Sequence, residues 1–520
     1  MTDIAGNRTL NTLLDVQARD RPDADAMIVE RADGSVDSRT YAELRSEVIT
    51  LAQGLARMGV QAGDAVLLHL PNGVEVVTAW FALARLGAVM VPSNPLFTER
   101  EVAHLASSAR VVAALCREHD AVRVGAATRL TPDRLVLVGT GRRARNSYEW
   151  VLTQGELPSE LPEVDGDDLV EIIFTSGTTA APKGVMLTHA NCVRAGEQIA
   201  KSLALRPDDR LLTSLPVFHV NAQSSTVLAG MSVGAAFVLL ETYSASKFLE
   251  SLVRHQATVT SLVAMQVRTL LRQPASDLDQ AHRVRLVFYA INVSDEEFVD
   301  FESRFGMRLL NGYGLSEAMM AVTIAPAYGD RRWPSVGLSV VDREVVILDG
   351  DGGSVAPGQS GEIGVRGVPG RSLMLGYLDN EEASAAALAG GVLRTGDTGY
   401  LDHDGYLYFV DRKKDMIKRS GENVAAREVE AVLQQHPFVV DVAVIGVPDD
   451  IRDESIHAYV SVCGEVDGQS LIAWCADRLA RFKVPSVVEI LEELPKTSIG
   501  KIEKRTLVAL HARAGSPGAR

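Results

Sequence analysis

Cysteine and aromatic residues are scarce in this chain of 520 residues. Its four cysteines are Cys116, Cys192, Cys463 and Cys475, and no CxxC pair or Cys/His ligand spacing connects them. We therefore expect buried free thiols in a reducing cytoplasm, and neither a disulfide framework nor a zinc site. Aromatic residues make up 5% of the chain, so the core must consist mostly of Ala, Val, Leu and Ile.

Long apolar runs and an excess of positive charge are also missing. No run approaches the roughly 18 apolar residues that span a bilayer, and the N-terminal residues lack the basic and apolar segments of a secretory signal. The formal net charge is −15. Because phosphate neutralisation requires basic stripes, this balance disfavours nucleic-acid binding. We expect a cytoplasmic protein with no membrane or nucleic-acid partner.

Lysine is rare and unevenly placed. The chain has 10 Lys against 42 Arg, none of the lysines precedes Lys183, and seven follow Arg412. A chain that prefers arginine so strongly uses lysine where a compact ammonium group is needed.

The first part of the chain alternates between short apolar runs and helical patterns. Apolar runs at 65–70, 88–91 and 111–115 predict strands, separated by helical spacing at 76–86 and 101–107. The pattern returns after the middle, with strands expected at 210–215, 238–240, 259–262 and 286–289. Strands that alternate with helices predict a mostly parallel sheet.

The texture changes twice further on. Short alternating strands with many glycines between 337 and 408 indicate an antiparallel barrel or sandwich. Beyond residue 411 the pattern predicts a compact α+β unit, with helices at 427–435 and 470–482 and strands at 440–446, 457–462 and 487–491.

The most informative segment is 172–189, IIFTSGTTAAPKGVMLTH. An apolar strand leads into a loop that gathers hydroxyl groups, backbone N–H groups and the first lysine of the chain, Lys183. These groups together predict a phosphate cradle. The loop differs from the GxxxxGK[ST] nucleotide loop, because no Ser or Thr follows a Gly-Lys pair in the required order.

This loop resembles that of the adenylate-forming (ANL) superfamily, which includes acyl-CoA ligases, peptide-synthetase adenylation domains and luciferases. Further elements follow in the family's order: NGYGLSE at 311–317, TGD at 395–397, DRKKDMIKRSGENVAARE at 411–428 and LPKTSIGKIEK at 494–504. Within the family, Phe218-His219, Arg332-Trp333-Pro334 and KRSGENV at 418–424 resemble ligases of the crotonobetaine/carnitine-CoA type.

The resemblance implies a fold and a domain division. The expected fold has a large α/β N-terminal domain, built from two doubly wound subdomains and a small β-barrel, and a small mobile α+β C-terminal domain. Residues 1–411 would bind the acyl group and the nucleotide. Residues 412–520 would form the lid that carries the hinge, the pantetheine face and the terminal lysine.

The resemblance also implies the groups that handle the nucleotide. Lys501, Glu317 and Lys183 would be catalytic, and Glu317 would also bind Mg²⁺, for which one carboxylate plus phosphate oxygens is adequate. The ATP and AMP contacts would come from Thr175, Ser176, Gly177, Thr178, Thr179, Ala180, Lys183, Asn311, Gly312, Tyr313, Gly314, Ser316, Asp397 and Arg412.

Other residues would handle CoA, domain movement and the acid. Lys414 would be the hinge. CoA would meet Lys418, Ser420, Gly421 and Glu422, and the acyl pocket would be lined by His219, Asn221, Ala264, Ala290, Gly314 and Met319. Because His219 follows Phe218 where amino-acid-activating domains usually have Asp, an amino-acid substrate is disfavoured.

Two positions depart from the family pattern. Ala180 stands where the phosphate loop usually has Gly, and Tyr289-Ala290-Ile291-Asn292 replaces a run of small residues beside adenine. A methyl group at a position with positive φ costs about 1–2 kcal/mol or displaces the phosphates. Weak adenylation, with use of an acyl-adenylate made elsewhere, is therefore a second hypothesis.

The expected activity is an AMP-forming acid–thiol ligase that converts a carboxylic acid, through acyl-AMP, to its CoA thioester. ATP or acyl-AMP, Mg²⁺ and coenzyme A would be its cofactors. Thioester formation alone, from acyl-AMP supplied by a separate adenylating enzyme, and transfer to a carrier-protein thiol in trans remain alternatives. A catalytically inactive scaffold is disfavoured by Lys183, Glu317, Asp397 and Lys501, and a homodimer stays open.

Overall fold

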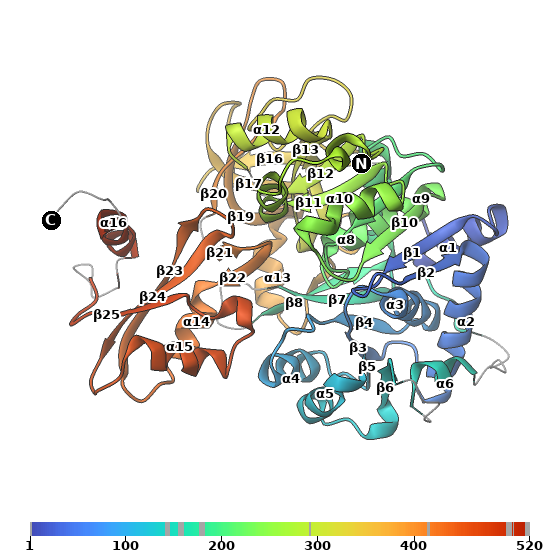
Figure 1. The fold of residues 1–520 in the computed structure, drawn as a ribbon, viewed down its shortest axis with the longest axis horizontal. Coiled ribbons are helices and arrows are strands. Elements are labelled where there is room, and N and C mark those ends of the chain that lie inside the picture. The colour runs from blue at the N-terminus through green and yellow to red at the C-terminus, as the bar shows by residue number, and fades with distance from the viewer. Residues whose placement is uncertain are drawn as a thin grey trace. The chain divides into compact units, whose positions relative to one another are not determined.

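The computed structural model describes residues 3–140, 146–153, 161–175, 182–290, 293–412, 416–495, 502 and 504–514. The chain divides into two compact units. The large unit comprises Met1–Pro95, Val102–Phe174 and Gly184–Asp411, and the small unit comprises Leu96–Glu101, Thr175–Lys183 and Arg412–Arg520. Figure 1 labels many of the elements of each unit.

The first sheet has seven strands in the order β18-β8-β7-β4-β3-β5-β6. Its strands are β3 (Ala65–His69), β4 (Val89–Pro92), β5 (Ala113–Arg117), β6 (Leu135–Val138), β7 (Leu169–Thr175), β8 (Lys183–Thr188) and β18 (Gly376–Tyr377). The intervening helices are α2 (Tyr41–Arg57), α3 (Val74–Leu86), α4 (Glu99–Ser108), α5 (Ala121–Thr128) and α6 (Tyr148–Thr153). Strands β3 to β6 pair in parallel, as the alternating pattern predicts.

The second sheet has nine strands in the order β15-β14-β13-β12-β11-β9-β10-β1-β2. They are β1 (Asp25–Glu30), β2 (Val36–Thr40), β9 (Arg210–Thr213), β10 (Ala236–Leu240), β11 (Val259–Val263), β12 (Leu286–Ala290), β13 (Arg308–Leu315), β14 (Met320–Ile324) and β15 (Leu338–Ser339). The accompanying helices are α1 (Leu10–Asp20), α7 (His189–Ser202), α8 (Val220–Ala222), α9 (Ala229–Val233), α10 (Ala245–Arg254), α11 (Ala264–Leu271) and α12 (Asp295–Phe305).

The glycine-rich region of the large unit forms an antiparallel sheet in the order β16-β17-β19-β20. Its strands are β16 (Glu344–Leu348), β17 (Gly361–Arg366), β19 (Val392–Leu401) and β20 (Leu407–Arg412), and helix α13 (Glu381–Ala387) precedes β19. The large unit therefore combines two doubly wound sheets with a small β-barrel region, and the predicted fold class is confirmed.

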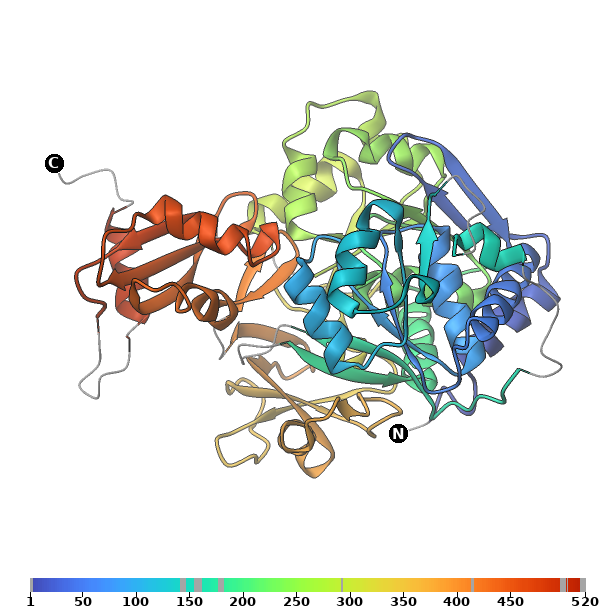
Figure 2. The ribbon, with the colours of Figure 1, turned by 90° about the horizontal axis from the view of Figure 1, so that it is seen from below.

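The small unit is α+β. Its sheet runs β22-β21-β24-β23, and β25 pairs with β24. The strands are β21 (Met416–Arg419), β22 (Glu422–Ala425), β23 (Val439–Asp449), β24 (Asp453–Val462) and β25 (Val487–Ile490), and the helices are α14 (Ala426–Leu433), α15 (Gly468–Ala476) and α16 (Lys504–Ala514). Helices α14 and α15 lie against the sheet (Figure 2), and their side chains share one apolar core with it.

Helix α15 is shorter than the sequence pattern predicts. It ends at Ala476, and residues 481–483 form a separate 3₁₀ turn. Leu479 and Ala480 remain buried after the helix ends. The apolar spacing therefore continues beyond Ala476 because these side chains join the core from a turn.

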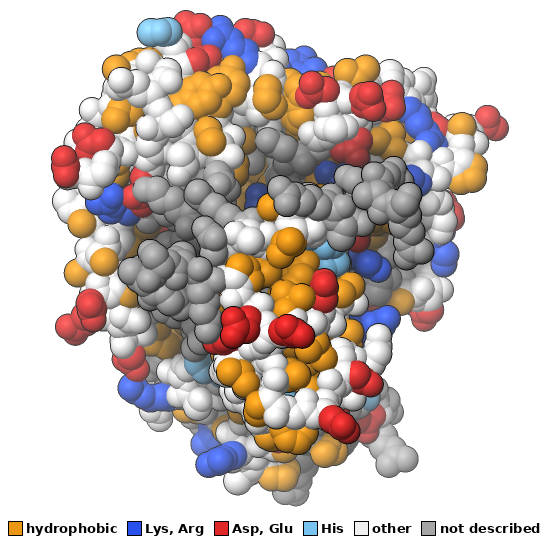
Figure 3. Space-filling model, turned by 90° about the vertical axis from the view of Figure 1, so that its left-hand side faces the viewer, with side chains coloured by type: hydrophobic (Ala, Val, Ile, Leu, Met, Phe, Trp, Pro, Cys, Tyr) orange, Lys and Arg blue, Asp and Glu red, His pale blue; other side chains and the backbone are white. Residues whose placement is uncertain are grey.

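The surface of the small unit exposes several large apolar side chains. They are Phe438, Val440, Ile451, Val487, Ile490, Val508 and Leu510. On the face drawn in Figure 3, apolar side chains gather among scattered aspartates and glutamates.

All four cysteines are free thiols. Cys116, Cys192 and Cys475 are buried, as expected, whereas Cys463 is exposed. Burial raises the pKa of Cys116 and of Cys475 to about 12, which keeps both thiols protonated. In the part of the chain that the structure describes, no helix has the length and apolar character needed to cross a membrane.

Candidate active site

Four parallel strands of the second sheet end beside one another. Thr213 on β9 is paired in register with Ser261 on β11, Val263 with Ala290 on β12, and Tyr289 with Asn311 on β13. Ligands of open α/β sheets bind outside the carboxyl ends of the strands. The topology thus brings the predicted acyl and adenine residues of the large unit to one sheet edge.

The expected acyl-pocket residues take different positions at this edge. His219 and Asn221, in the turn and short helix α8 after β9, are half-buried, as is Ala290 at the end of β12. Ala264, the first residue of α11, is fully buried, and Met319 is buried with a left-handed backbone at φ 45°. Their role in an acyl pocket stays a prediction.

The predicted adenine strand is held by close packing. A Cβ atom at Gly314 would lie 2.0 Å from the carbonyl oxygen of Met320 on β14, and one at Gly312 would lie 2.4 Å from the ring of Phe288. Both glycines are therefore required by the approach of neighbouring strands. Asn311, at the same strand end, donates from Nδ2 to the carbonyl oxygen of Ser335 at 3.2 Å.

Tyr313 and Asp397, far apart in the sequence, lie together in the structure. The Tyr313 hydroxyl donates to Oδ2 of Asp397 at 2.7 Å, and Asp397 is buried, with 2% of its surface exposed. Tyr313 comes from β13 and Asp397 from β19, so this bond joins two sheets of the large unit. The TGD element thereby brings its carboxylate next to Tyr313 on β13, the strand that we predict to contact adenine.

Glu317 is held by the segment that leads into β18. It lies in a 3₁₀ turn, Ser316–Ala318, directly after β13. Its carbonyl oxygen accepts from the backbone N–H of Met374 at 2.8 Å, and its Oε1 accepts from the hydroxyl of Tyr377 at 2.8 Å. Burial and the carboxylate of Glu317 raise the pKa of Tyr377, so the phenol stays protonated and donates.

Arg343 stabilises the same turn through hydrogen bonds to backbone carbonyl groups. Its guanidinium group donates to the carbonyl oxygens of Ala318 and Ser372, and the side chain is buried. Burial, with a smaller effect of the nearby Arg194 charge, lowers the pKa of Arg343 to about 9. One buried cation therefore joins the Glu317 turn to the segment before β18.

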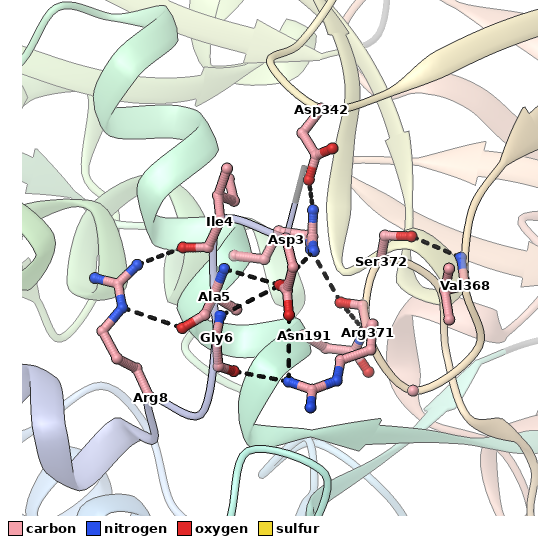
Figure 4. Close-up of polar contacts among 12 residues, drawn as sticks. Asp3, Ile4, Ala5, Gly6, Arg8, Asn191, Asp342, Val368, Arg371 and Ser372 are labelled. Atoms are coloured by element: carbon pink, nitrogen blue, oxygen red, sulfur yellow. Dashed lines mark hydrogen bonds and ion pairs between the residues drawn. The ribbon is translucent and has the colours of Figure 1, made fainter. Parts of the chain in front are cut away.

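Helix α7 also holds that segment, and the close-up in Figure 4 shows Asn191 beside Arg371. Asn191 donates from Nδ2 to the carbonyl oxygens of Arg371 and Leu373, at 3.0 and 2.9 Å. The Thr188 hydroxyl, which caps α7, donates to the carbonyl oxygen of Gly370 at 2.6 Å. The Thr188–Asn191 capping box thus fixes the start of the helix and the position of the segment.

The N-terminal residues complete this network. Arg194 on α7 forms ion pairs with Asp342 and, at 3.0 Å, with Asp3. Arg371 donates to the carbonyl oxygen of Gly6 at 2.7 Å (Figure 4). The first residues of the chain therefore contribute to the support of the Glu317 turn.

Several predicted residues lie at the margin of what the structure describes. Thr175 is the last residue of β7 and Lys183 the first residue of β8. Arg412 ends β20, where only the backbone is described. Outside the described residues lie Ser176, Gly177, Thr178, Thr179, Ala180, Ile291, Asn292, Lys414 and Lys501.

The predicted CoA face of the small unit is a tight hairpin. Strands β21 and β22 pair Arg419 with Glu422, which leaves Ser420 and Gly421 as a two-residue turn. Both have positive φ, 54° and 89°, as a type I′ hairpin turn requires. The backbone N–H of Lys418 donates to Glu454 Oε2 at 2.6 Å, which anchors the hairpin to β24.

Glu317 is the residue of this site that we predict to bind Mg²⁺. No group of three or more His, Cys, Asp or Glu residues that could hold a metal occurs in the described ranges. Mg²⁺ usually binds one or two carboxylates plus substrate phosphates. The carboxylate of Glu317 would supply hard oxygen donors, and the Tyr377 hydroxyl holds one of its oxygens in place.

Tyr377, Arg343 and Asn191 are supporting residues that reasoning from the sequence missed. Tyr377 belongs to a Gly-Tyr pair in a glycine-rich stretch, which has no catalytic pattern. Arg343 carries a detectable signal, since it is a charged residue two positions before the apolar run 345–348, yet only the tertiary structure shows what it contacts.

Two family models match most of the chain. The model described as AMP-binding enzyme matches residues 14–378, and the one described as AMP-binding enzyme C-terminal domain matches residues 428–501. The chain belongs to the AMP-binding enzyme family. This AMP-binding enzyme is also 39% identical over 516 residues to the crotonobetaine/carnitine–CoA ligase of Salmonella agona (strain SL483), covering 97% of this chain and 100% of the relative.

Solved structures agree with this assignment. An o-succinylbenzoate CoA synthetase double mutant from Bacillus subtilis, bound with a product analogue, matches with a TM-score of 0.84 and 26% identity over 95% of this chain and 98% of that one. Amide bond synthetase McbA from Marinactinospora thermotolerans matches with a TM-score of 0.83 and 29% identity over 95% of this chain and 99% of that one. The AMP-binding enzyme is therefore a ligase of the AMP-forming acid–thiol type, and family members of this kind use ATP and CoA.

Proposed function

We propose that this enzyme activates a carboxylic acid as acyl-AMP and transfers the acyl group to the thiol of coenzyme A. The observation that carries the proposal is a pair of contacts, Tyr313 on β13 with Asp397, and Glu317 in the turn after β13 with Tyr377. These contacts support the proposal because they bring the predicted adenine-stacking ring next to the predicted ribose carboxylate and hold the predicted Mg²⁺ ligand in the turn that follows. The likeness to crotonobetaine/carnitine–CoA ligase supports CoA as the acceptor.

The proposed first step forms a mixed anhydride. The substrate carboxylate oxygen attacks the α-phosphorus of ATP, and pyrophosphate leaves. Tyr313 would stack on adenine, Asp397 and Arg412 would bind the ribose hydroxyls, and Lys183 and Lys501 would stabilise charge on phosphate and carboxylate oxygens. Bound Mg²⁺ would supply charge stabilisation at the phosphates, with Glu317 as its protein ligand.

The proposed second step forms the thioester. The CoA thiol loses its proton, its sulfur attacks the acyl carbonyl carbon, and AMP leaves. The pantetheine arm of CoA would lie along Gly421 and its hairpin neighbours Ser420 and Glu422. Lys418 would lie near the CoA phosphates. Residues 412–520 would move as a lid about Lys414, because the two steps need different groups at one place.

The acyl pocket is proposed to lie at the carboxyl ends of β9, β11 and β12. His219 and Asn221, in the turn after β9, would contact the acid, and Ala264 and Ala290 would bound the space it occupies. The relatives' acids are the first candidates: crotonobetaine and carnitine for the Salmonella enzyme, and o-succinylbenzoate for the Bacillus one.

Ala180 favours a second candidate function, thioester formation from preformed acyl-AMP. A methyl group in place of glycine in a phosphate loop restricts the backbone conformation or prevents the backbone from approaching the phosphates closely. Under this alternative the enzyme depends on a separate adenylating partner.

A paired assay tests both proposals. Purified protein receives either acid, ATP, Mg²⁺ and CoA, or synthetic acyl-AMP and CoA, and acyl-CoA is measured by mass for crotonobetaine, carnitine, o-succinylbenzoate and a wider acid panel. The leading proposal predicts product in both arms, and Glu317→Gln should abolish product only in the ATP arm. Product from acyl-AMP alone, together with pyrophosphate release restored by Ala180→Gly, would support the second candidate. Failure of both arms with every acid would refute both.

A further inference from the structure

A carboxyl group lies fully buried inside the first sheet. Glu171 is in the middle of β7, beside Met90 of β4, and is 0% exposed. Its Oε1 accepts a hydrogen bond from Nε2 of Gln223 at 2.6 Å. Gln223 is also 0% exposed and begins the π-helical turn Gln223–Leu228.

The Gln223 amide has both of its hydrogens engaged. Nε2 donates to Glu171 and, at 2.9 Å, to the carbonyl oxygen of Val217. Two buried oxygens are left over, Oε2 of Glu171 and Oε1 of Gln223, and neither has a hydrogen-bond partner among the described residues. Both atoms are acceptors when the carboxyl is ionised, so neither can satisfy the other unless the carboxyl carries a proton.

We propose that Glu171 is a neutral carboxylic acid that pairs reciprocally with Gln223. In this pair the Gln223 N–H donates to Oε1 of Glu171, and the Glu171 O–H donates to Oε1 of Gln223. The one proton satisfies both leftover oxygens, whose burial without partners is unfavourable.

The surroundings of Glu171 agree with a neutral group. Burial raises its pKa to about 8, and Gln223 is the partner that opposes the rise. The titratable group facing it from α7 is the buried thiol of Cys192, whose pKa is raised chiefly by burial. Strand β4 contributes Met90, and no ion pair among the described side chains includes Glu171.

The pair fixes the turn that follows β9. Gln223 holds the carbonyl oxygen of Val217, and the N–H of Val217 donates to Oδ1 of Asn72 at 2.8 Å. Phe218 and His219 come next, and the N–H of His219 donates to the carbonyl oxygen of Pro216 at 3.1 Å. Glu171 is thus a positioning residue for the His219 turn, and its effect on acid binding rests on the proposed function.

Two variants separate the proton from the packing. Glu171→Gln keeps the shape and the reciprocal hydrogen bonds but cannot ionise, whereas Glu171→Leu removes them. Glu302→Gln is the matched control, because Glu302 forms an ion pair with Arg331 instead. The full-length protein is used throughout, without added ligand for the first two measurements.

The first measurement is the infrared difference spectrum of wild type minus Glu171→Gln at pH 6 and pH 10. We expect a protonated-carboxyl C=O band at pH 6 that disappears at pH 10, and no such band when Glu302→Gln is compared. A wild type without this band at pH 6 would overturn the proposal.

The second measurement is hydrogen exchange of the peptide that covers Val217 to Gln223. We expect exchange about tenfold faster in Glu171→Leu than in wild type, because a rate change of this size corresponds to loss of a hydrogen bond. Exchange in Glu171→Gln should stay near that of wild type. Equal protection in all three proteins would overturn the positioning role.

The third measurement is the pH profile of acyl-CoA formation with the best acid of the paired assay. We expect kcat/KM for the acid to fall above pH 8 more steeply in wild type than in Glu171→Gln, through KM more than kcat. Identical profiles would overturn the link to acid binding. Because the first two measurements need no substrate, they stand even if the proposed function fails.

Discussion

The hydroxyl of Tyr313 donates to the carboxylate of Asp397 at 2.7 Å and joins β13 to β19. A hydrogen bond to a charged group contributes roughly 1.5–3 kcal/mol. This bond therefore orients the carboxylate that we expect to meet the ribose hydroxyls.

Removal of this hydroxyl should weaken nucleotide binding. We expect Tyr313→Phe to raise the KM for ATP about tenfold, since the ring is kept and only the orientation of Asp397 is lost. Tyr406→Phe is a matched control, because its hydroxyl donates to the backbone carbonyl of Asp330. Steady-state kinetics check this, and an equal rise in both variants would contradict a specific role for the Tyr313–Asp397 bond.

The Tyr377 phenol should set the magnesium requirement. Loss of a group that orients a metal ligand typically costs about 10–100-fold in metal affinity or activity. We expect Tyr377→Phe to raise the half-saturating Mg²⁺ concentration about tenfold. Tyr243→Phe, which removes a contact with Thr269 instead, should leave it unchanged. A normal Mg²⁺ titration of Tyr377→Phe would show that Glu317 is oriented by its backbone alone.

Arg343 should stabilise the large unit and the Glu317 turn together. In Arg343→Met, the carbonyl oxygens of Ala318 and Ser372 lose their donor, and two unsatisfied buried acceptors cost about 2–5 kcal/mol. We expect a lower free energy of unfolding in urea and a lower kcat. Arg366→Met, at an exposed pair with Glu344, is the control and should change stability little. Wild-type stability in Arg343→Met would argue against the clamp.

The Gly421 turn should affect only the thioester step. Because φ is 89° at Gly421, Gly421→Ala is strained by about 1–2 kcal/mol and displaces the hairpin. We expect a higher KM for CoA with unchanged pyrophosphate release. Gly405→Ala has the same kind of strain, at φ 85°, and should lower stability without changing the KM for CoA. A rise in both variants would mean that strain alone is responsible.

Acid should destabilise the fold through His189. Burial lowers its pKa to about 4, and its Nδ1 accepts from the N–H of Leu10 at 3.2 Å. The unfolded state takes up a proton near pH 6.5 whereas the folded state does not, so stability falls as the pH falls from about 6.5 to about 4. The loss is roughly 3 kcal/mol for this group.

His189→Asn tests this pH dependence. Asparagine offers Oδ1 in place of Nδ1 but does not titrate, so the variant should lose less stability between pH 6.5 and 4 than wild type. Urea unfolding at several pH values measures it, with the exposed His403→Asn as the control. Parallel curves for wild type and His189→Asn would exclude His189 as a source of acid sensitivity.

The sequence by itself determined the order of elements and the family. Apolar residues that repeat every second position identify strands, and those that repeat with the helical period identify helices, so both can be read from a local segment. The segments 172–189, NGYGLSE and TGD are contiguous in the sequence and can therefore be recognised without knowledge of the fold. The helix expected at 470–482 was too long. Leu479 and Ala480 are buried as the pattern indicated, but they lie in a turn beyond the end of the helix.

Only the tertiary structure decided which side chains meet. Tyr313 and Asp397 are 84 residues apart, Glu317 and Tyr377 are 60 apart, and Glu171 and Gln223 are 52 apart. Such contacts depend on how sheets and connecting segments pack, and the periodicity of one segment contains no information about its partner. Burial also changes chemistry that the sequence leaves undefined: a glutamate in an apolar strand becomes a candidate neutral acid because water is excluded from both faces of a parallel sheet.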